Sequence, residues 1–248
     1  MTSVSEILSR LNLSRRDLND VSLVQLETVF KDLTVKEISL LCAVNRRFNT
    51  VCENESFWRN KVSDDYGIHK KYGSTWRQTA INMDKVDMIN MDGVWIDERT
   101  YREILDDVLQ NGLSSIVDLQ IQYLLPYADN RKHLALILLT DYDRDDVRLQ
   151  HFAGDIMGRD YTENELDDIF YIKSRETNVI YASVLTYKGK KKEIYLPGSR
   201  NSYASTGTAL LSYEFIRDMI DPIFYVMQSS SFSDEKLYYI FHYYESDI

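Results

Sequence analysis

Three aspartates spaced two residues apart are the side chains of this sequence that most resemble a chemical site. Asp141, Asp143 and Asp145 match the first half of a calcium-binding loop, where carboxylates at alternate positions chelate the ion. Such a loop needs glycine at its sixth position for a sharp turn and glutamate at its twelfth for bidentate ligation. The chain has Asp146 and Phe152 at those positions. We therefore expect no calcium site.

Other groups with chemical potential are equally incomplete. The segment 198–207 is rich in Ser, Thr and Gly and could cradle an anion, but it lacks the Lys-Ser/Thr of a phosphate loop and the Gly-x-Ser-x-Gly of a nucleophile elbow. The lysine cluster 190–192 fits a targeting or phosphate patch less well than a solvated turn. The histidines lack the spacing and the cysteine neighbours of a zinc site: His69, His133, His151 and His242. We expect no catalytic residue, metal or cofactor, and hence no enzyme.

The elements with the clearest pattern occupy residues 21–58. A first stripe has apolar residues at i, i+3, i+4 and i+7, which lie on one side of a helix. Thr34 and Glu37 then form a capping box that starts a second helix, with its own apolar face. Asn54 can cap a third helix, which ends at Gly67. The apolar faces comprise Leu26, Val29, Phe30 and Leu33, then Ile38, Leu41, Val44, Phe48 and Val51, then Trp58, Val62 and Tyr66.

The order of these residues closely resembles the F-box, the adaptor motif that attaches substrate receptors to Skp1 in cullin-RING ubiquitin ligases. The matching positions are Leu26, Val29, Phe30, Leu33, Glu37, Ile38, Val44, Arg46, Arg47, Phe48 and Trp58, with no gap. One departure concerns the Leu-Pro that usually opens the motif, since Val21 and Ser22 stand there and the proline that would fix the first turn is missing.

The resemblance implies a Skp1-binding surface and continues to about residue 81. The residues it assigns to Skp1 binding are Leu26, Val29, Phe30, Leu33, Ile38, Leu41, Val44, Phe48 and Trp58. The next segment, with Asp-Tyr-Gly and then Ser74, Trp76 and Arg77, resembles the brace that often follows an F-box, and we expect Ser74 to cap its helix. F-box proteins of large DNA viruses have a similar arrangement. The alternative is a plain three-helix bundle whose apolar stripes are simply its core.

Composition sets wider bounds. With 44% hydrophobic and 27% charged residues, the chain can form one or two globular domains. The longest apolar run, Leu134 to Leu139, is too short for a membrane span, and the start has no signal-peptide pattern. We expect no membrane association and a cytoplasmic location, in the host if the protein is viral, with the nucleus left open. Cys42 and Cys52 are expected to be buried free thiols.

The charge is unevenly divided. Residues 1–85 hold 13 basic and 11 acidic side chains, whereas the remainder holds 16 basic and 28 acidic ones, and the net charge of the whole chain is −10. An acidic surface repels phosphate, so we expect no nucleic-acid partner and favour a basic target protein. Most of the 18 tyrosines also lie after residue 86, and tyrosine suits a recognition surface as well as a core.

The tail reads as mixed α+β and mainly helical. Asp97 is the expected cap of a helix that ends before Gly112, and a second helix is expected over 115–125. The segment 133–139 fits a helix or a buried strand, and Thr162 with Glu165 forms a capping box. Two β-branched and aromatic runs flank a Lys-Gly-Lys, which predicts a β-hairpin near 178–196.

We therefore expect two domains, an F-box-like helical domain over 1–85 and an acidic, Tyr-rich α+β domain over 86–248. The first hypothesis is an F-box-type receptor that docks on Skp1, and through it on a cullin, and presents a target protein for ubiquitination. The second is a Skp1-binding decoy or a structural protein, for example of a virus, that presents no substrate. The third is an enzyme of unknown type with its site in the tail.

Overall fold

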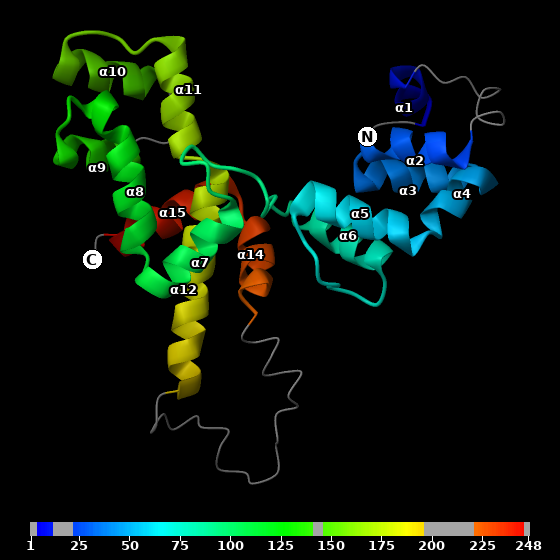
Figure 1. Ribbon diagram of the computed structural model, residues 1–248. Coiled ribbons are helices and arrows are strands. Elements are labelled where there is room, and N and C mark those ends of the chain that lie inside the picture. Colours follow the sequence, from blue (N-terminus) through cyan, green and yellow to red (C-terminus); the bar gives the residue numbers. More distant parts are fainter. Residues whose placement is uncertain (1–3, 12–21, 141–145, 196–220, 246–248) are drawn as a thin grey trace. The chain divides into compact units, whose positions relative to one another are not determined.

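The computed structural model describes residues 4–11, 22–140, 146–195 and 221–245. The chain divides into two compact units, Met1–Met91 (unit 1) and Asp92–Ile248 (unit 2). All the regular elements of the described residues are helices, and their one recorded β pairing is an isolated bridge between Val94 and Thr100 (Figure 1). No helix within these ranges combines the length and the apolarity needed to cross a bilayer.

Unit 1 is a series of short capped helices. The structure confirms the capping box of Thr34 with Glu37, the cap at Asn54 and the left-handed ending at Gly67, where φ is 63°. Ser22 and Gln25 form a further capping box. The helices are α1 (Val4–Arg10), α2 (Leu23–Lys31), α3 (Val35–Val44), α4 (Arg46–Cys52), α5 (Glu55–Tyr66) and α6 (Trp76–Lys85). Short helices of this kind are marginal alone, so packing must hold them in place.

The last residues of unit 1 fasten onto the helices before them. The Met91 N–H donates to the carbonyl of Tyr66 at 2.9 Å, and the Met88 N–H donates to the carbonyl of Met83 at 3.0 Å. Met88, Ile89 and Met91 are all buried. Because these apolar residues belong to the core of unit 1, the compact unit extends six residues beyond position 85.

Unit 2 is organised around one long helix. The helix α12 (Arg175–Tyr195) packs against α7, α14 and α15 (Figure 1). Val179, Ile180 and Val184 on α12 are completely buried. The other elements are α7 (Tyr101–Asn111), α8 (Ser114–Leu124), the 3-10 helix η2 (Leu125–Ala128), α9 (Lys132–Thr140), α10 (Asp146–Met157), α11 (Glu163–Ile172), α14 (Pro222–Ser230) and α15 (Asp234–Glu245).

The predicted α+β class and the β-hairpin near 178–196 are wrong, because residues 178–195 belong to the helix α12. The sequence of this stretch has an almost continuous run of apolar residues, which is typical of a buried strand. A helix that neighbouring helices cover on several sides has the same kind of run. The hydroxyl of Ser183 illustrates this: its one proton lies within hydrogen-bond reach of the carbonyl of Val179 in its own helix and of that of Tyr225 in α14. Gly189 lies within the helix instead of in a turn.

Other expectations for unit 2 fared better. The structure confirms the helix predicted over 115–125 as α8, the capping box of Thr162 with Glu165 at α11, and the helical alternative for 133–139 as α9. Two expected caps are displaced by a few residues: Thr100 caps α7 where Asp97 was predicted, and Thr75 caps α6 where Ser74 was predicted.

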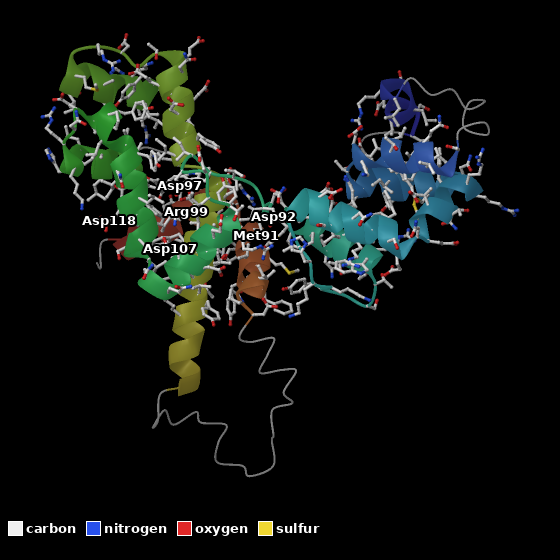
Figure 2. The ribbon with its side chains drawn as sticks, in the orientation of Figure 1. Met91, Asp92, Asp97, Arg99, Asp107 and Asp118 are labelled. Atoms are coloured by element: carbon white, nitrogen blue, oxygen red, sulfur yellow. A yellow bond between two sulfur atoms is a disulfide. The ribbon has the colours of Figure 1, made fainter. Side chains whose placement is uncertain are left out.

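Asp97 has a different role, which explains the first displacement. It accepts a hydrogen bond from the guanidinium of Arg99 at 2.6 Å, and the same guanidinium reaches Asp107 on α7 at 3.1 Å (Figure 2). Burial by itself lowers the pKa of Arg99, but the hydrogen bonds from its group to the two carboxylates outweigh burial and raise it. These charges fasten the segment before α7 to the helix, so the cap falls to Thr100.

Candidate functional site

The residues first considered for chemistry do not assemble a site in the described part of the chain. Asp141, Asp143 and Asp145 lie outside it, as does the segment 198–207, and the side chains of the lysines 190–192 are also outside the description. The histidines are exposed and lie on different elements: His69, His133, His151 and His242. Among the described residues, no group of three or more His, Cys, Asp or Glu side chains is placed to hold a metal ion.

The F-box-like residues come together, but mostly in the interior of unit 1. Seven of the nine residues assigned to Skp1 binding are at most 1% exposed: Leu26, Phe30, Leu33, Ile38, Leu41, Phe48 and Trp58. Val29 is half-buried, and Val44 ends α3 with its side chain outside the description. The buried members therefore hold the helices of unit 1 in register.

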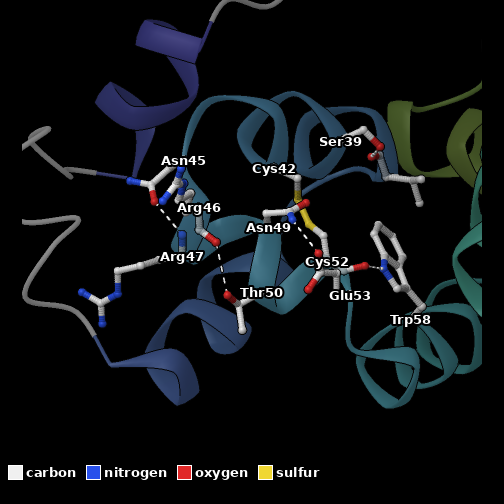
Figure 3. The surroundings of a disulfide bond; sticks show 11 residues. Ser39, Cys42, Asn45, Arg46, Arg47, Asn49, Thr50, Cys52, Glu53 and Trp58 are labelled. Carbon is white, nitrogen blue, oxygen red and sulfur yellow. Dashed lines mark hydrogen bonds between the residues drawn. A yellow bond between two sulfur atoms is a disulfide. The ribbon is translucent and has the colours of Figure 1, made fainter.

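Aromatic packing centres this interior. The ring of Phe30 lies 5.5 Å from that of Phe48 and 6.1 Å from that of Phe57, centroid to centroid. Trp58 packs edge-on against Phe57 at 5.2 Å, and its indole N–H donates to the carbonyl of Cys52 at 2.8 Å (Figure 3). This bond satisfies a carbonyl at the end of α4, so Trp58 closes the corner between α4 and α5.

Charged side chains support the same helices. Glu37, within its capping box, also accepts a hydrogen bond from Arg10 of α1 at 2.8 Å. Burial would raise the pKa of Glu37, but the hydrogen bonds from Arg10 and from the backbone N–H of Thr34 outweigh it and lower the pKa. On the other side Lys61, which is only 5% exposed, donates to the carbonyl of Lys31 at 2.6 Å and pairs with Asp65 at 2.8 Å.

Cys42 and Cys52 are paired as a disulfide between α3 and α4, so the expectation of free thiols is wrong (Figure 3). Their Cα atoms are 6.3 Å apart, within the range that a disulfide spans. The backbone explains the pairing. Asn45 is extended, with φ −144° and ψ 130°, and its side chain caps α4 by accepting from the N–H of Arg47. The chain therefore breaks between α3 and α4, and the two cysteines face each other.

Among the side chains of unit 1 that the structure describes, the exposed large apolar ones are Val24 and Leu40. Val24 on α2 is 73% exposed and Leu40 on α3 is 38% exposed, and we call these two residues the outer apolar residues. Ala43, one turn after Leu40, is also exposed. A periodic apolar stripe identifies the side of a helix that faces the core, so it does not identify exposed residues such as these. The signal that could have found them is an apolar residue on the polar side of an amphipathic helix.

In unit 2, the helices α9, α12 and α15 and the connection between α11 and α12 line a hollow. Its lining comprises Leu139, Lys173, Arg175, Asn178, Asp234, Tyr238 and Phe241. Lys173 donates to the carbonyl of Leu138 at 2.7 Å, and Arg175 donates to that of Ser230 at 2.5 Å. No sequence pattern singled out these residues, because the two cations are isolated charges in an acidic stretch.

No protein-family model, curated protein or solved structure matches this chain. The likeness to F-boxes therefore depends on the sequence of residues 21–81 alone. These residues all belong to unit 1.

Proposed function

We propose that this protein is an F-box-type substrate receptor. Unit 1 docks on a Skp1-like adaptor that is bound to a cullin, and unit 2 holds a target protein. The ubiquitin-conjugating enzyme on the cullin then modifies the target. The receptor supplies no catalytic residue, since its contribution is to raise the local concentration of the target beside the enzyme. We place this activity in the cytoplasm, where cysteines are kept reduced, so we expect the pair Cys42 and Cys52 to be oxidised in the purified protein and reduced in the cell.

The observation that carries the proposal is the agreement between the F-box-like residue order and one compact helical unit. Caps at Thr34 and Asn54 start α3 and α5 where the F-box-like segment predicts helices, whereas the predicted second helix is divided at Asn45 into α3 and α4. Ser22 stands where the family has proline, and its capping box with Gln25 starts α2 there. The missing proline is thereby compensated, since both devices fix the first turn of a helix.

The docking contacts we assign are the outer apolar residues, Val24 and Leu40, together with the half-buried Val29 of α2. Isolated exposed apolar residues are common on protein surfaces, so finding two of them does not by itself indicate a docking site. The assignment is supported by their position, because both lie on the helices that the resemblance assigns to Skp1 binding. Each would be removed from water in a complex while the buried stripe keeps α2 and α3 rigid.

Co-purification with Skp1 tests the proposal. The full-length chain should capture Skp1 and a cullin from cell extract. The substitutions Val24→Asp and Leu40→Asp should together abolish capture, because each would bury an unpaired charge. Unit 2 offers matched controls: Val147 is 66% exposed and Leu136 is 39% exposed, and Asp at these positions should leave capture unchanged.

The same experiment separates a receptor from a decoy. Proteins captured along with the chain should show ubiquitination that is lost when residues 92–248 are removed. Skp1 capture with no such ubiquitination would contradict the receptor and support a decoy. Absence of Skp1 from the captured material would contradict the proposal as a whole.

A further inference from the structure

The hollow in unit 2 gathers positive charge in an acidic part of the chain. Its lining has two cations, Lys173 and Arg175, and one carboxylate, Asp234. Residues after position 85 carry 16 basic and 28 acidic side chains, so this local balance is opposite in sign to its surroundings. The remaining polar groups of the lining are the amide of Asn178 and the hydroxyl of Tyr238, which can both donate hydrogen bonds.

Both cations are held in fixed positions. The ammonium of Lys173 is 2.7 Å from the carbonyl of Leu138, at the end of α9. The guanidinium of Arg175 donates to the carbonyl of Ser230 and pairs with Asp234 at 3.1 Å, and the Arg175 side chain is only 18% exposed. A ligand that meets such groups has little side-chain entropy to remove, which favours binding.

The geometry points to the kind of ligand. Hydrogen-bond donors on α12 and α15 line the hollow. The one carboxylate of the lining, Asp234, has a side chain that is 60% exposed, so water screens its charge more than that of Arg175. Leu139 and the buried Phe241 provide an apolar wall. Carboxylates bind best where a positive charge and several hydrogen-bond donors converge, and an apolar stem next to the carboxylate would contact Leu139 and Phe241.

We propose that this hollow binds a carboxylate on an apolar stem, as offered by the C-terminus of a peptide or by an acidic side chain. Its use as the place where unit 2 recognises a target protein rests on the proposed receptor function, whereas carboxylate binding itself does not. The overall acidity of the tail favours basic partners at long range, and the hollow would select one carboxylate within such a partner.

Amide NMR of the ¹⁵N-labelled full-length chain tests the proposal with three small probes. These are N-acetyl-leucine, its neutral counterpart N-acetyl-leucinamide, and N-acetyl-glutamic acid α-methylamide, whose only carboxylate is on the side chain. We expect saturable shifts of the Asn178 side-chain amide and the Arg175 Nε–H with at least one acid, and binding at least tenfold weaker with the neutral amide. Comparing the two acids distinguishes a C-terminus from an acidic side chain.

Two substitutions complete the test. Lys173→Gln removes the charge but keeps a donor for Leu138, and it should weaken binding of the preferred acid several-fold. Lys132→Gln makes the same charge change at a side chain that is 72% exposed and outside the hollow, so it should have no effect. Equal binding of acid and amide, equal effects of the two substitutions, or no saturable shift would overturn the proposal. Skp1 capture by Lys173→Gln should be normal, so failure of this site and failure of the receptor function give different results.

Discussion

Replacing Phe30 and Leu40 separately by alanine should divide the folding role of unit 1 from its binding role. Phe30 is 1% exposed and contacts two other aromatic rings, so Phe30→Ala should destabilise the unit by about 3 to 5 kcal/mol. That is a large part of the roughly 5 to 15 kcal/mol that keeps a small domain folded.

Leu40 differs because 38% of its surface is still open to water. Full burial of a leucine contributes about 1.5 to 3 kcal/mol, so covering this remainder in a complex contributes about 1 kcal/mol. Leu40→Ala should therefore weaken Skp1 binding about fivefold. Alanine is also at least as good a helix former as leucine, so the loss of stability should stay near 1 kcal/mol.

The assay combines urea unfolding of each full-length variant with calorimetric titration against purified Skp1. Phe30→Ala should show a lowered unfolding midpoint for unit 1, and its binding should fall with the folded fraction. Leu40→Ala should keep nearly the original midpoint and lose affinity. The reasoning is refuted if Leu40→Ala binds like the original chain, or if Phe30→Ala keeps its stability and loses affinity.

Three other predictions concern the fold. Gly189→Ala should stabilise unit 2 by about 0.5 to 1 kcal/mol in thermal unfolding, because Gly189 lies in a helix with open space around an added Cβ, whereas a hairpin turn there would make the change destabilising. Hydrogen bonds from Arg159 and from the backbone of Thr162 lower the pKa of Glu165 to about 2, below its ordinary 4.5. Ionised Glu165 therefore stabilises the fold above about pH 4.5, and this contribution is lost as the pH falls toward 2. In an acid titration of stability, Glu165→Gln should lack the loss that the original chain shows over this pH range. The intact mass of the unreduced chain should be 2 Da below the dithiol value. Because a disulfide restricts the unfolded chain, Cys52→Ala should lower the free energy of unfolding of unit 1 by about 3 kcal/mol. Two free thiols in the denatured, unreduced protein would contradict the pairing.

Local signals predicted the helix starts of this protein well. A capping box is decided by residues three positions apart, and the boxes at Thr34 and Thr162 formed as expected. Asp97 failed as a cap because a residue two positions away, Arg99, competes for its carboxylate and is itself anchored to Asp107. Asp107, which anchors Arg99, lies ten residues after Asp97 on α7, so a capping pattern read from neighbouring residues does not indicate which residue caps the helix.

Long-range packing decided what the sequence could not. The run from Asn178 to Tyr187 has the composition of a strand, and helix propensity is only a weak preference that tertiary contacts override. Contacts from α7, α14 and α15 make α12 a buried helix. The pairing of Cys42 with Cys52 similarly follows from the extended backbone at Asn45, which no spacing rule indicates.

The candidate site shows the same division between local and tertiary information. The apolar stripe correctly identified residues that lie together, but a stripe reports burial and does not say whether the covering surface belongs to the same chain or to a partner. For Leu26, Phe30 and Trp58 the cover is unit 1 itself. Val24 and Leu40 are identified as docking candidates by their exposure in the folded unit, which the apolar stripe does not report.

Direct titration of the purified full-length chain with purified Skp1 tests the central claim. The proposal predicts a one-to-one complex with a dissociation constant below about 1 µM and a negative heat-capacity change from burial of apolar surface. The double substitution of Val24 and Leu40 by Asp should remove the binding, and the Asp substitutions at Val147 and Leu136 should preserve it. No detectable binding of the unaltered chain, or binding that the double substitution leaves intact, would contradict the account.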